Sequence, residues 1–220
     1  MIPEILLIDK DRGMSSFDVI RILKKKFPRG TKIGHSGTLD PLATGLLVIG
    51  LGKGTKRLAE FLKLPKRYVA EATFGMTSLT YDAQGPFTTV VSESDLLLSP
   101  ISVSVVETVI LENFLGEISQ TPPDFSAVHV NGERAYEIAR RGEKVVLEPR
   151  KVTITSCDVV SCIWPKLVLD VRCSSGTYIR SLVHDLGAKL GCGAYMSNLR
   201  RVSVGDYHVD NAHKISEFMA

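Results

Sequence analysis

The stretch GHSGTLDPLATG, residues 34–45, is the most unusual in the chain. Its three glycines let the backbone turn tightly and approach a ligand. Pro41 pushes Asp40 out of the helical region into an extended conformation. A loop built in this way holds one carboxylate at a fixed place in a cleft. The simpler interpretation, an Asp-Pro turn before a strand, stays open on these residues alone.

Strands and helices surround this loop without a regular βαβ rhythm. Hydrophobic periodicity and capping residues predict these elements. Helices are expected over 17–27, 102–114, 133–141 and 177–190, with a further helix after the loop that opens 52–64. Strands are expected over 5–8, 46–49, 67–74, 167–173 and 195–204. Such a mixture favours an α+β fold with a mixed, largely antiparallel central sheet flanked by helices, in a single domain over 1–220.

Composition excludes several classes of protein. The chain has 220 residues, of which 44% are hydrophobic and 23% are charged, as in an ordinary globular protein. No apolar run reaches the roughly 18 residues of a membrane span, and the N-terminus lacks a basic signal region. We therefore expect a cytoplasmic protein with no membrane partner. The four cysteines form no CxxC pair and the five histidines are scattered, so we expect no bound metal.

Charge is distributed unevenly along the chain. Residues 1–67 carry a net charge of +8, residues 68–133 carry −9 and contain no Lys or Arg, and residues 134–220 carry +4. Basic first and last thirds indicate a positive surface that would attract a polyanion. The alternative is solvated charge that clusters by chance.

A second informative segment is CSSGTYIRSLVHDLG, residues 173–187. A helix that begins near Arg180 offers an anion site, and an arginine beside a cleft can pair bidentately with a carboxylate, for which Asp40 is a candidate. An ordinary surface arginine is the alternative. Tyr68, which follows two basic residues, suits base stacking, although a strand tyrosine is more often part of the core.

Nucleotide-phosphate and hydrolase motifs are absent. GLGKG (50–54) is neither GxGxxG nor part of GxxxxGK[ST], and the chain contains no GxSxG or HExxH. A phosphate-binding enzyme built on GLGKGTK is therefore disfavoured.

The chain resembles the TruB family of tRNA pseudouridine synthases. Seven matching segments run in order over nearly the whole chain: IDKDRGMSS (8–16), GHSGTLDPLATGLLVIGLGKGTK (34–56), KRYVA (66–70), YDAQG (81–85), PPDFSAVHVNGERAYEIARRG (122–142), CSSGTYIRSLVHDLGAKLGCGA (173–194) and LRRVSVG (199–205). The resemblance implies the pseudouridine synthase catalytic fold and an isomerase that converts the T-loop uridine of tRNA to pseudouridine(55).

The resemblance also assigns roles to residues. It places the catalytic aspartate at Asp40 and the histidine that helps open the RNA loop at His35. It places the tyrosine that stacks on the target base at Tyr68 and a pocket-lining leucine at Leu199. Substrate-binding positions also fall on Tyr178, Arg180 and Lys56. No cofactor, metal or protein partner is implied; the implied partner is the T-arm of tRNA.

The sequence departs from the family pattern at three places. Asp11 follows Lys10 where proline is usual, and Leu79 stands where a second acidic residue is usual. Only about fifteen residues follow Gly205, so we expect no C-terminal RNA-binding module. The competing function is a non-catalytic RNA-binding or RNA-chaperone protein of the same fold, which would not require Asp40 together with Arg180.

Overall fold

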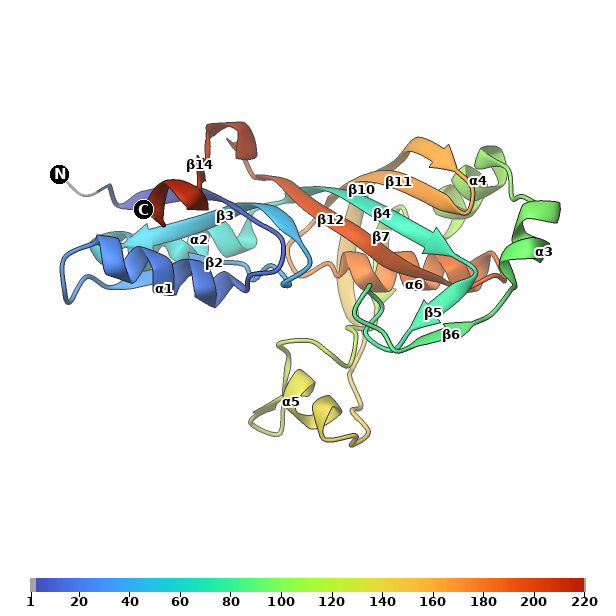
Figure 1. Cartoon of the computed structure of the whole chain (residues 1–220), viewed down its shortest axis with the longest axis horizontal. Coiled ribbons are helices and arrows are strands. Elements are labelled where there is room, and N and C mark those ends of the chain that lie inside the picture. Colours follow the sequence, from blue (N-terminus) through green and yellow to red (C-terminus); the bar gives the residue numbers. More distant parts are fainter. Residues whose placement is uncertain (1–2, 220) are drawn as a thin grey trace. The chain divides into compact units, whose positions relative to one another are not determined.

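The computed structural model describes residues 3–219, which form two compact units. The first unit combines the chain up to Val69 with the segment from Leu199 onward, and the second comprises Ala70–Asn198. Two strands, β4 (Lys66–Phe74) and β12 (Ala194–Val204), run from one unit into the other (Figure 1). Within residues 3–219, no helix is both long enough and apolar enough to cross a bilayer.

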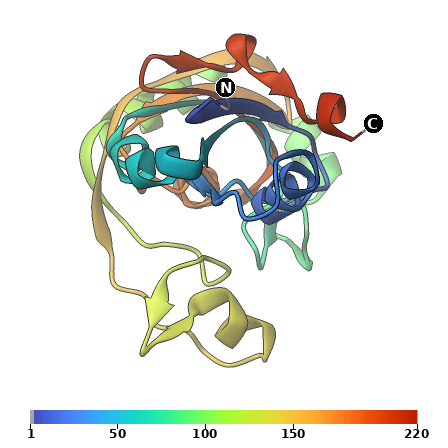
Figure 2. The same ribbon diagram turned by 90° about the vertical axis from the view of Figure 1, so that its left-hand side faces the viewer.

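The first unit places a sheet between two helices. Its strands are ordered β14-β1-β3-β12, with β2 paired to β3 and β13 paired to β12. The elements are β1 (Ile5–Lys10), α1 (Ser16–Lys26), β2 (Ile33–Ser36), β3 (Thr44–Leu51), η1 (Gly52–Arg57), α2 (Leu58–Lys63), β13 (Tyr207–His208), η2 (Val209–Asn211), β14 (His213–Lys214) and η3 (Ile215–Phe218). Figure 2 shows α1 and α2 on opposite sides of the unit.

Strand β3 is buried on both faces, which explains its continuous apolar sequence. Leu47, Ile49 and Leu51 pack in one cluster with the apolar residues of α1. Leu46 and Val48 point the other way, into a cluster that contains a phenylalanine of α2. Because successive side chains of a strand alternate between its faces, one run of leucine, valine and isoleucine joins both layers.

Helix α1 is delimited by local sequence. Ser15 caps it by accepting from the backbone N–H of Asp18, whose carboxylate accepts in turn from the N–H of Ser15. This reciprocal capping box satisfies two donors that the first turn would otherwise leave unpaired. Three lysines fill the last turn, where the helix dipole favours cations, and Pro28 follows the C-cap.

The second unit contains the strand order β12-β4-β11-β10-β7, with a long antiparallel β10–β11 hairpin. Its elements are β5 (Met76–Ser78), β6 (Phe87–Thr89), α3 (Glu93–Leu98), α4 (Val103–Asn113), β7 (Gly116–Gln120), β8 (His129–Val130), β9 (Glu133–Arg134), α5 (Ala135–Arg140), β10 (Arg150–Ile163), β11 (Lys166–Cys173) and α6 (Ile179–Lys189). Alternate residues of β11 are buried, as the half-buried strand pattern predicts.

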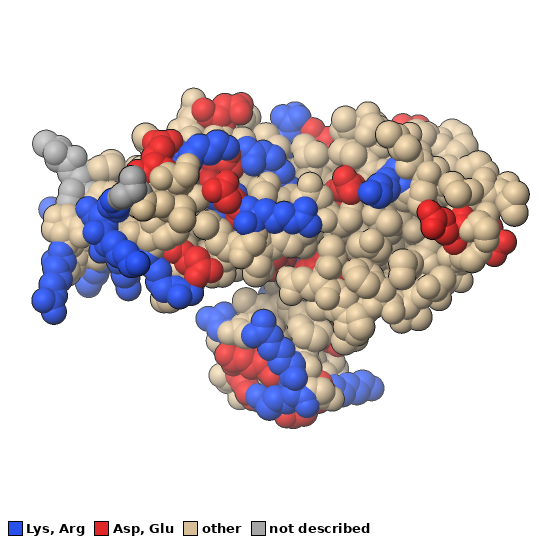
Figure 3. Space-filling model, viewed as in Figure 1, with Lys and Arg blue, Asp and Glu red and all other residues tan. Residues whose placement is uncertain are grey.

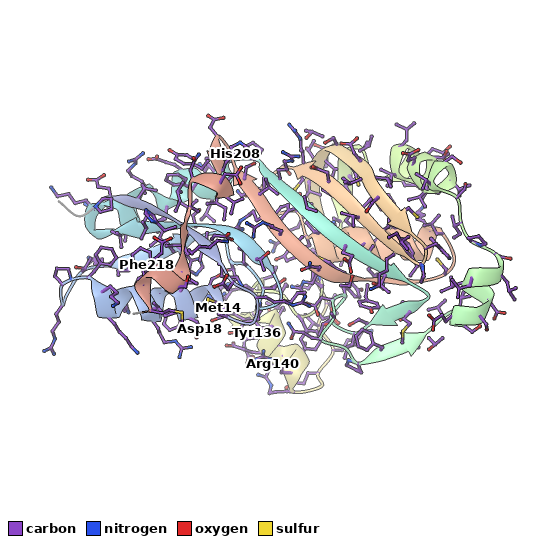
Figure 4. All side chains as sticks on the ribbon, turned by 45° about the horizontal axis from the view of Figure 1, so that its top comes forward. Met14, Asp18, Tyr136, Arg140, His208 and Phe218 are labelled. Atoms are coloured by element: carbon purple, nitrogen blue, oxygen red, sulfur yellow. The ribbon has the colours of Figure 1, made fainter. Side chains whose placement is uncertain are left out.

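The segment β8–β9–α5 stands away from the sheet of its own unit (Figures 1 and 2). It is held together internally, since Arg141 forms ion pairs with Glu133 and Glu143. Tyr136 and Arg140 lie together on this segment in Figure 4, with the guanidinium 5.3 Å from the ring centroid.

The α+β fold class predicted from the sequence is confirmed. The sheet is mixed, with β1–β14 and β3–β12 parallel and β1–β3, β2–β3, β7–β10, β10–β11 and β12–β13 antiparallel. The single catalytic domain over 1–220 stays a prediction.

Candidate active site

The loop between β2 and β3 carries Asp40. The chain leaves β2 at Ser36 and enters β3 at Thr44, and the two strands pair antiparallel. Leu39 and Leu42 are buried, whereas Asp40 is half-buried. The apolar neighbours therefore anchor the loop in the core, while the aspartate lies at the boundary with solvent.

The residues on both sides of Asp40 are hydrogen-bonded to the first residue of α1 and to the turn before this helix. The N–H of Leu39 donates to Oγ of Ser16 at 2.8 Å, and this hydroxyl donates back to the carbonyl oxygen of Leu39 at 3.1 Å. The N–H of Gly13 donates to the carbonyl oxygen of Pro41 at 2.7 Å. Three hydrogen bonds thus fix the backbone immediately before and after Asp40.

Arg201 of β12 joins the start of the loop to strand β3. Its side chain is buried, donating from Nη2 to the carbonyl oxygen of Gly37 at 2.9 Å and from Nε to that of Leu46 at 2.7 Å. Gly45 passes so close that an added Cβ would lie 2.3 Å from the carbonyl oxygen of Arg201, and its φ is +100°. Only glycine fits there, so this glycine of the motif serves strand packing.

A second buried cation, Lys10 of β1, lies close enough to Asp40 and Arg201 to feel the charge of both. Its ammonium donates to the carbonyl oxygens of Asp11 at 2.9 Å and Met14 at 2.7 Å. Burial lowers the pKa of Lys10 to about 8, against the opposing attraction of Asp40. Arg201 adds a smaller lowering by repulsion. Met14, one of these two acceptors, is labelled in Figure 4 and lies just before the cap residue of α1.

His35 lies on β2, opposite Ile49 of β3, and is half-buried. Its Nδ1 is buried and has no hydrogen-bond partner among the described residues. Burial lowers the pKa of His35, and repulsion from Arg201 lowers it further. The imidazole is therefore neutral at physiological pH, which suits an apolar wedge better than a cationic contact.

Three further predicted site residues lie in the first unit. Tyr68 of β4 is 9% exposed, on the buried face of its strand. Leu199 of β12 is buried, and its carbonyl oxygen accepts from Oγ1 of Thr44 at 3.4 Å, where the Asp40 loop ends. Lys56 is exposed in η1 and lines a surface hollow with Lys32.

Arg180 lies in the second unit and is not an ordinary surface residue, since its side chain is 6% exposed. It donates from Nη1 to the carbonyl oxygen of Thr80 at 2.9 Å and from Nη2 to that of Phe125 at 3.0 Å. Its Nη1 also lies 3.9 Å from a carboxylate oxygen of Asp82. The predicted pairing of Arg180 with Asp40 joins different units and stays a prediction.

Tyr178 occupies the cap position at the start of α6, where Gln120 holds its backbone. The N–H of Tyr178 donates to Oε1 of Gln120 at 2.8 Å, and Nε2 donates back to the carbonyl oxygen of Tyr178 at 3.0 Å. Gln120 is buried at the end of β7. This amide fixes the point at which α6 begins, two residues before Arg180.

Sequence reasoning missed most of the supporting residues: Lys10, Ser16, Asp82, Gln120 and Arg201. Each is buried and polar. Lys10 and Arg201 lie in motifs that the sequence singled out, but their burial was not expected. The available signal was a charged residue in an otherwise apolar strand. Such a side chain is seldom fully buried unless it has a partner, so its position indicates a buried polar contact.

The fold and the site define an α+β protein that presents one aspartate from a loop braced by buried polar groups. Comparison with protein families gives a match to the TruB family pseudouridylate synthase N-terminal domain over residues 21–179 and to the tRNA pseudouridylate synthase B C-terminal domain over residues 180–220. The chain belongs to the TruB family of pseudouridylate synthases.

Curated relatives carry the name tRNA pseudouridine synthase B. That of Aquifex aeolicus is 42% identical over 98% of this chain and 73% of its own length. That of Prochlorococcus marinus strain NATL1A is 44% identical over 96% of this chain and 66% of its own length. The chain thus spans about two thirds to three quarters of these two relatives.

Solved structures with similar folds include an H/ACA RNP bound to a substrate RNA containing 2′-deoxyuridine, with a TM-score of 0.69 and 25% identity. A Cbf5-Nop10-Gar1 complex gives a TM-score of 0.70 and 26% identity. Each match covers 96% of this chain and about half of the other, 51% and 52%. Both agree with the fold class that the sequence predicted.

Proposed function

We propose that this chain converts uridine to pseudouridine in the T-loop of tRNA, at position 55, with Asp40 as the catalytic residue. The observation that carries the proposal is the loop of Asp40, in which Leu39 is hydrogen-bonded to the first residue of α1 and Pro41 to the turn before this helix. Membership of the pseudouridylate synthase family supplies the reaction class.

The reaction suits a site with one carboxylate. The N1–C1′ bond of uridine breaks, the uracil rotates, and a C5–C1′ bond forms while C5 loses a proton and N1 gains one. This isomerisation has no net redox change or group transfer, so it demands no cofactor. A single carboxylate can act as nucleophile or base. A glycoside hydrolase of the usual kind uses two carboxylates a set distance apart.

Recognition requires the target base to leave its stack, which costs a few kcal/mol. In the proposal Tyr68 stacks on the flipped uracil and returns about 1–3 kcal/mol. His35, neutral and half-buried, fills the space that the base leaves. Tyr178, Arg180, Leu199 and Lys56 complete the substrate contacts.

The test is incubation of the protein with unmodified tRNA, followed by mapping of pseudouridine. Asp40→Asn keeps the size of the side chain but removes its charge, and we expect it to abolish turnover while RNA binding persists. Asp206→Asn is the matched control, because Asp206 is an exposed residue of the turn before β13. Substantial turnover by Asp40→Asn would remove Asp40 from the central role.

The same assay separates catalysis from simple RNA binding. A non-catalytic RNA-binding or RNA-chaperone protein would bind tRNA and form no pseudouridine with the wild-type chain. No structural observation favours that alternative.

Substrate range is tested with an isolated T-arm hairpin. We propose that the T-arm contains most of what the chain recognises. We also propose that the chain acts in the cytoplasm and without a protein partner. We therefore expect kcat/KM for the hairpin to approach that for intact tRNA at the same salt concentration. A loss beyond about a hundredfold, roughly 2.7 kcal/mol, would show that contacts elsewhere on the tRNA are needed.

A further inference from the structure

Five basic side chains surround two adjoining hollows at one end of the first unit. One hollow is lined by Lys32, Lys53 and Lys56, and its neighbour by Lys24, Arg29 and Lys32; together we call them the lysine-rich hollow. The residues come from the end of α1, the loop before β2, and η1. Figure 3 shows Lys and Arg gathered over this end of the unit.

These five cations differ from two arginines of the same unit. Arg21 pairs with Asp18, and Arg57 pairs with Glu4 and Glu60. Within residues 3–219, none of the five cations of the hollow has a hydrogen bond or an ion pair to a side chain or backbone group. The hollow therefore concentrates positive charge that the described chain does not neutralise.

Glu4 is the one carboxylate among the residues that line the lysine-rich hollow, and it lies 3.9 Å from Nη1 of Arg57. That pair leaves the other five charges uncompensated. Clustered like charges repel one another, so such a surface gains from a bound polyanion that releases its counterions.

We propose that the lysine-rich hollow binds the sugar-phosphate backbone of the RNA stem next to the loop that carries the target uridine. This proposal rests on the proposed function. Four of the five charges are lysines, which act as flexible point charges and contact phosphates without reading bases. The hollow therefore positions the stem, and the flipped uridine supplies the specificity.

Strand β2 links the hollow to the site. It begins at Ile33, directly after Lys32, carries His35, and ends at Ser36 before the Asp40 loop. Four residues of strand span about 13 Å. An RNA whose uridine reaches Asp40 therefore needs only a few further nucleotides to bring phosphates to the hollow.

The test combines Lys24→Gln, Lys32→Gln and Lys53→Gln in one full-length variant, called the hollow variant. Lys56 stays unchanged because it belongs to the proposed substrate contacts. The control variant combines Lys166→Gln, Arg172→Gln and Lys189→Gln, three exposed cations of β11 and α6 that give the same change in net charge. RNA hairpins with one loop and increasing stem length serve as ligands, and a loop-only RNA as reference.

For the wild type and the control variant we expect affinity to rise with stem length. For the hollow variant we expect that rise to disappear, and KM for the long hairpin to increase at least about tenfold while kcat at saturation is unchanged. The slope of log affinity against log salt should fall by about 2 in magnitude, since each lost phosphate contact removes roughly 0.7–0.9.

Equal stem-length dependence in the wild type and the hollow variant would overturn the proposal, as would an equal loss in the control variant. Loss of affinity for the loop-only RNA as well would place the contact in the loop and overturn the assignment to the stem. The proposed function fails separately, if the wild type binds the hairpins but forms no pseudouridine.

Discussion

Arg201 donates one hydrogen bond to the carbonyl oxygen of Gly37 and another to that of Leu46, so a single buried guanidinium joins the start of the loop that carries Asp40 to the strand that follows it. The side chain of Arg201 is almost fully removed from solvent, so water does not compete for these two hydrogen bonds as it does for a contact on the surface. A rigid planar fork holds two acceptors at a fixed separation.

We expect Arg201→Lys to lower kcat at least about tenfold, with KM changed little, because one ammonium on a flexible stem cannot reproduce the fork. Each carbonyl left without a donor costs about 1–3 kcal/mol of the free energy of unfolding. Steady-state kinetics and denaturant unfolding measure the two effects. A variant that loses stability but keeps kcat under folded conditions would limit Arg201 to a structural role.

Two adjacent serines provide a matched pair of substitutions. Ser15 caps α1, whereas the hydroxyl of Ser16 holds both the N–H and the carbonyl oxygen of Leu39 next to Asp40. Ser15→Ala should cost about 1 kcal/mol of stability and leave kcat unchanged in the folded protein. Ser16→Ala should reduce stability by about 1–3 kcal/mol and also reduce kcat. Similar kcat values for the two variants would contradict the role given to Ser16.

The lowered pKa of Lys10 predicts that the activity depends on pH. Burial lowers its pKa from 10.5 to about 8, so its positive charge beside Asp40 is lost above that pH. We expect kcat to decline as the pH rises through about 8. In Lys10→Met this decline should be absent and kcat lower throughout. A wild-type profile that is flat from pH 7 to pH 9, at roughly one unit either side of the pKa, would contradict the prediction.

The lowered pKa of Lys10 also predicts how the free energy of unfolding changes with pH. Between about pH 8 and 10.5 the unfolded chain binds the Lys10 proton and the folded chain does not, so the free energy of unfolding rises with pH over this window. The full difference is about 3 kcal/mol. Asp40, Asp11 and Asp18 attract the charged form, and Arg201 opposes it. Unfolding of the wild type and Lys10→Met at several pH values measures this contribution.

Local sequence predicted much of the fold because the elements concerned are determined locally. The capping serine and apolar spacing predicted α1, and the apolar run predicted β3, each within a few residues of its observed bounds. Strand β10 was missed, since its alternation is interrupted by two register shifts against β11. The helix predicted over 102–114 is confirmed by α4.

The supporting residues of the site could not be predicted in the same way. Arg201 and Gly37 are separated by 164 positions, and Gln120 and Tyr178 by 58. Their contacts exist only once distant strands are assembled, and nothing in the spacing of either segment encodes the other. The motifs therefore located Asp40 and Arg180, while the fold was needed to show which groups hold them.

Gln120 offers a test of the second unit. Its buried amide accepts from the N–H of Tyr178 and donates to the carbonyl oxygen of the same residue, which sets the start of α6. Gln120→Leu leaves both groups without this partner, at about 1–3 kcal/mol for each. We expect the first turn of α6 to fray and Arg180 to lose its fixed position, so that kcat/KM falls.

Gln120→Glu separates the two hydrogen bonds, because an ionised carboxylate still accepts from the N–H of Tyr178 but cannot donate to its carbonyl oxygen. Its kcat/KM should lie between those of the wild type and Gln120→Leu. Circular dichroism measures the helix content of each variant, and steady-state kinetics with unmodified tRNA as the substrate measures its activity. If Gln120→Leu retained wild-type kcat/KM, the positions of Tyr178 and Arg180 would not depend on this amide.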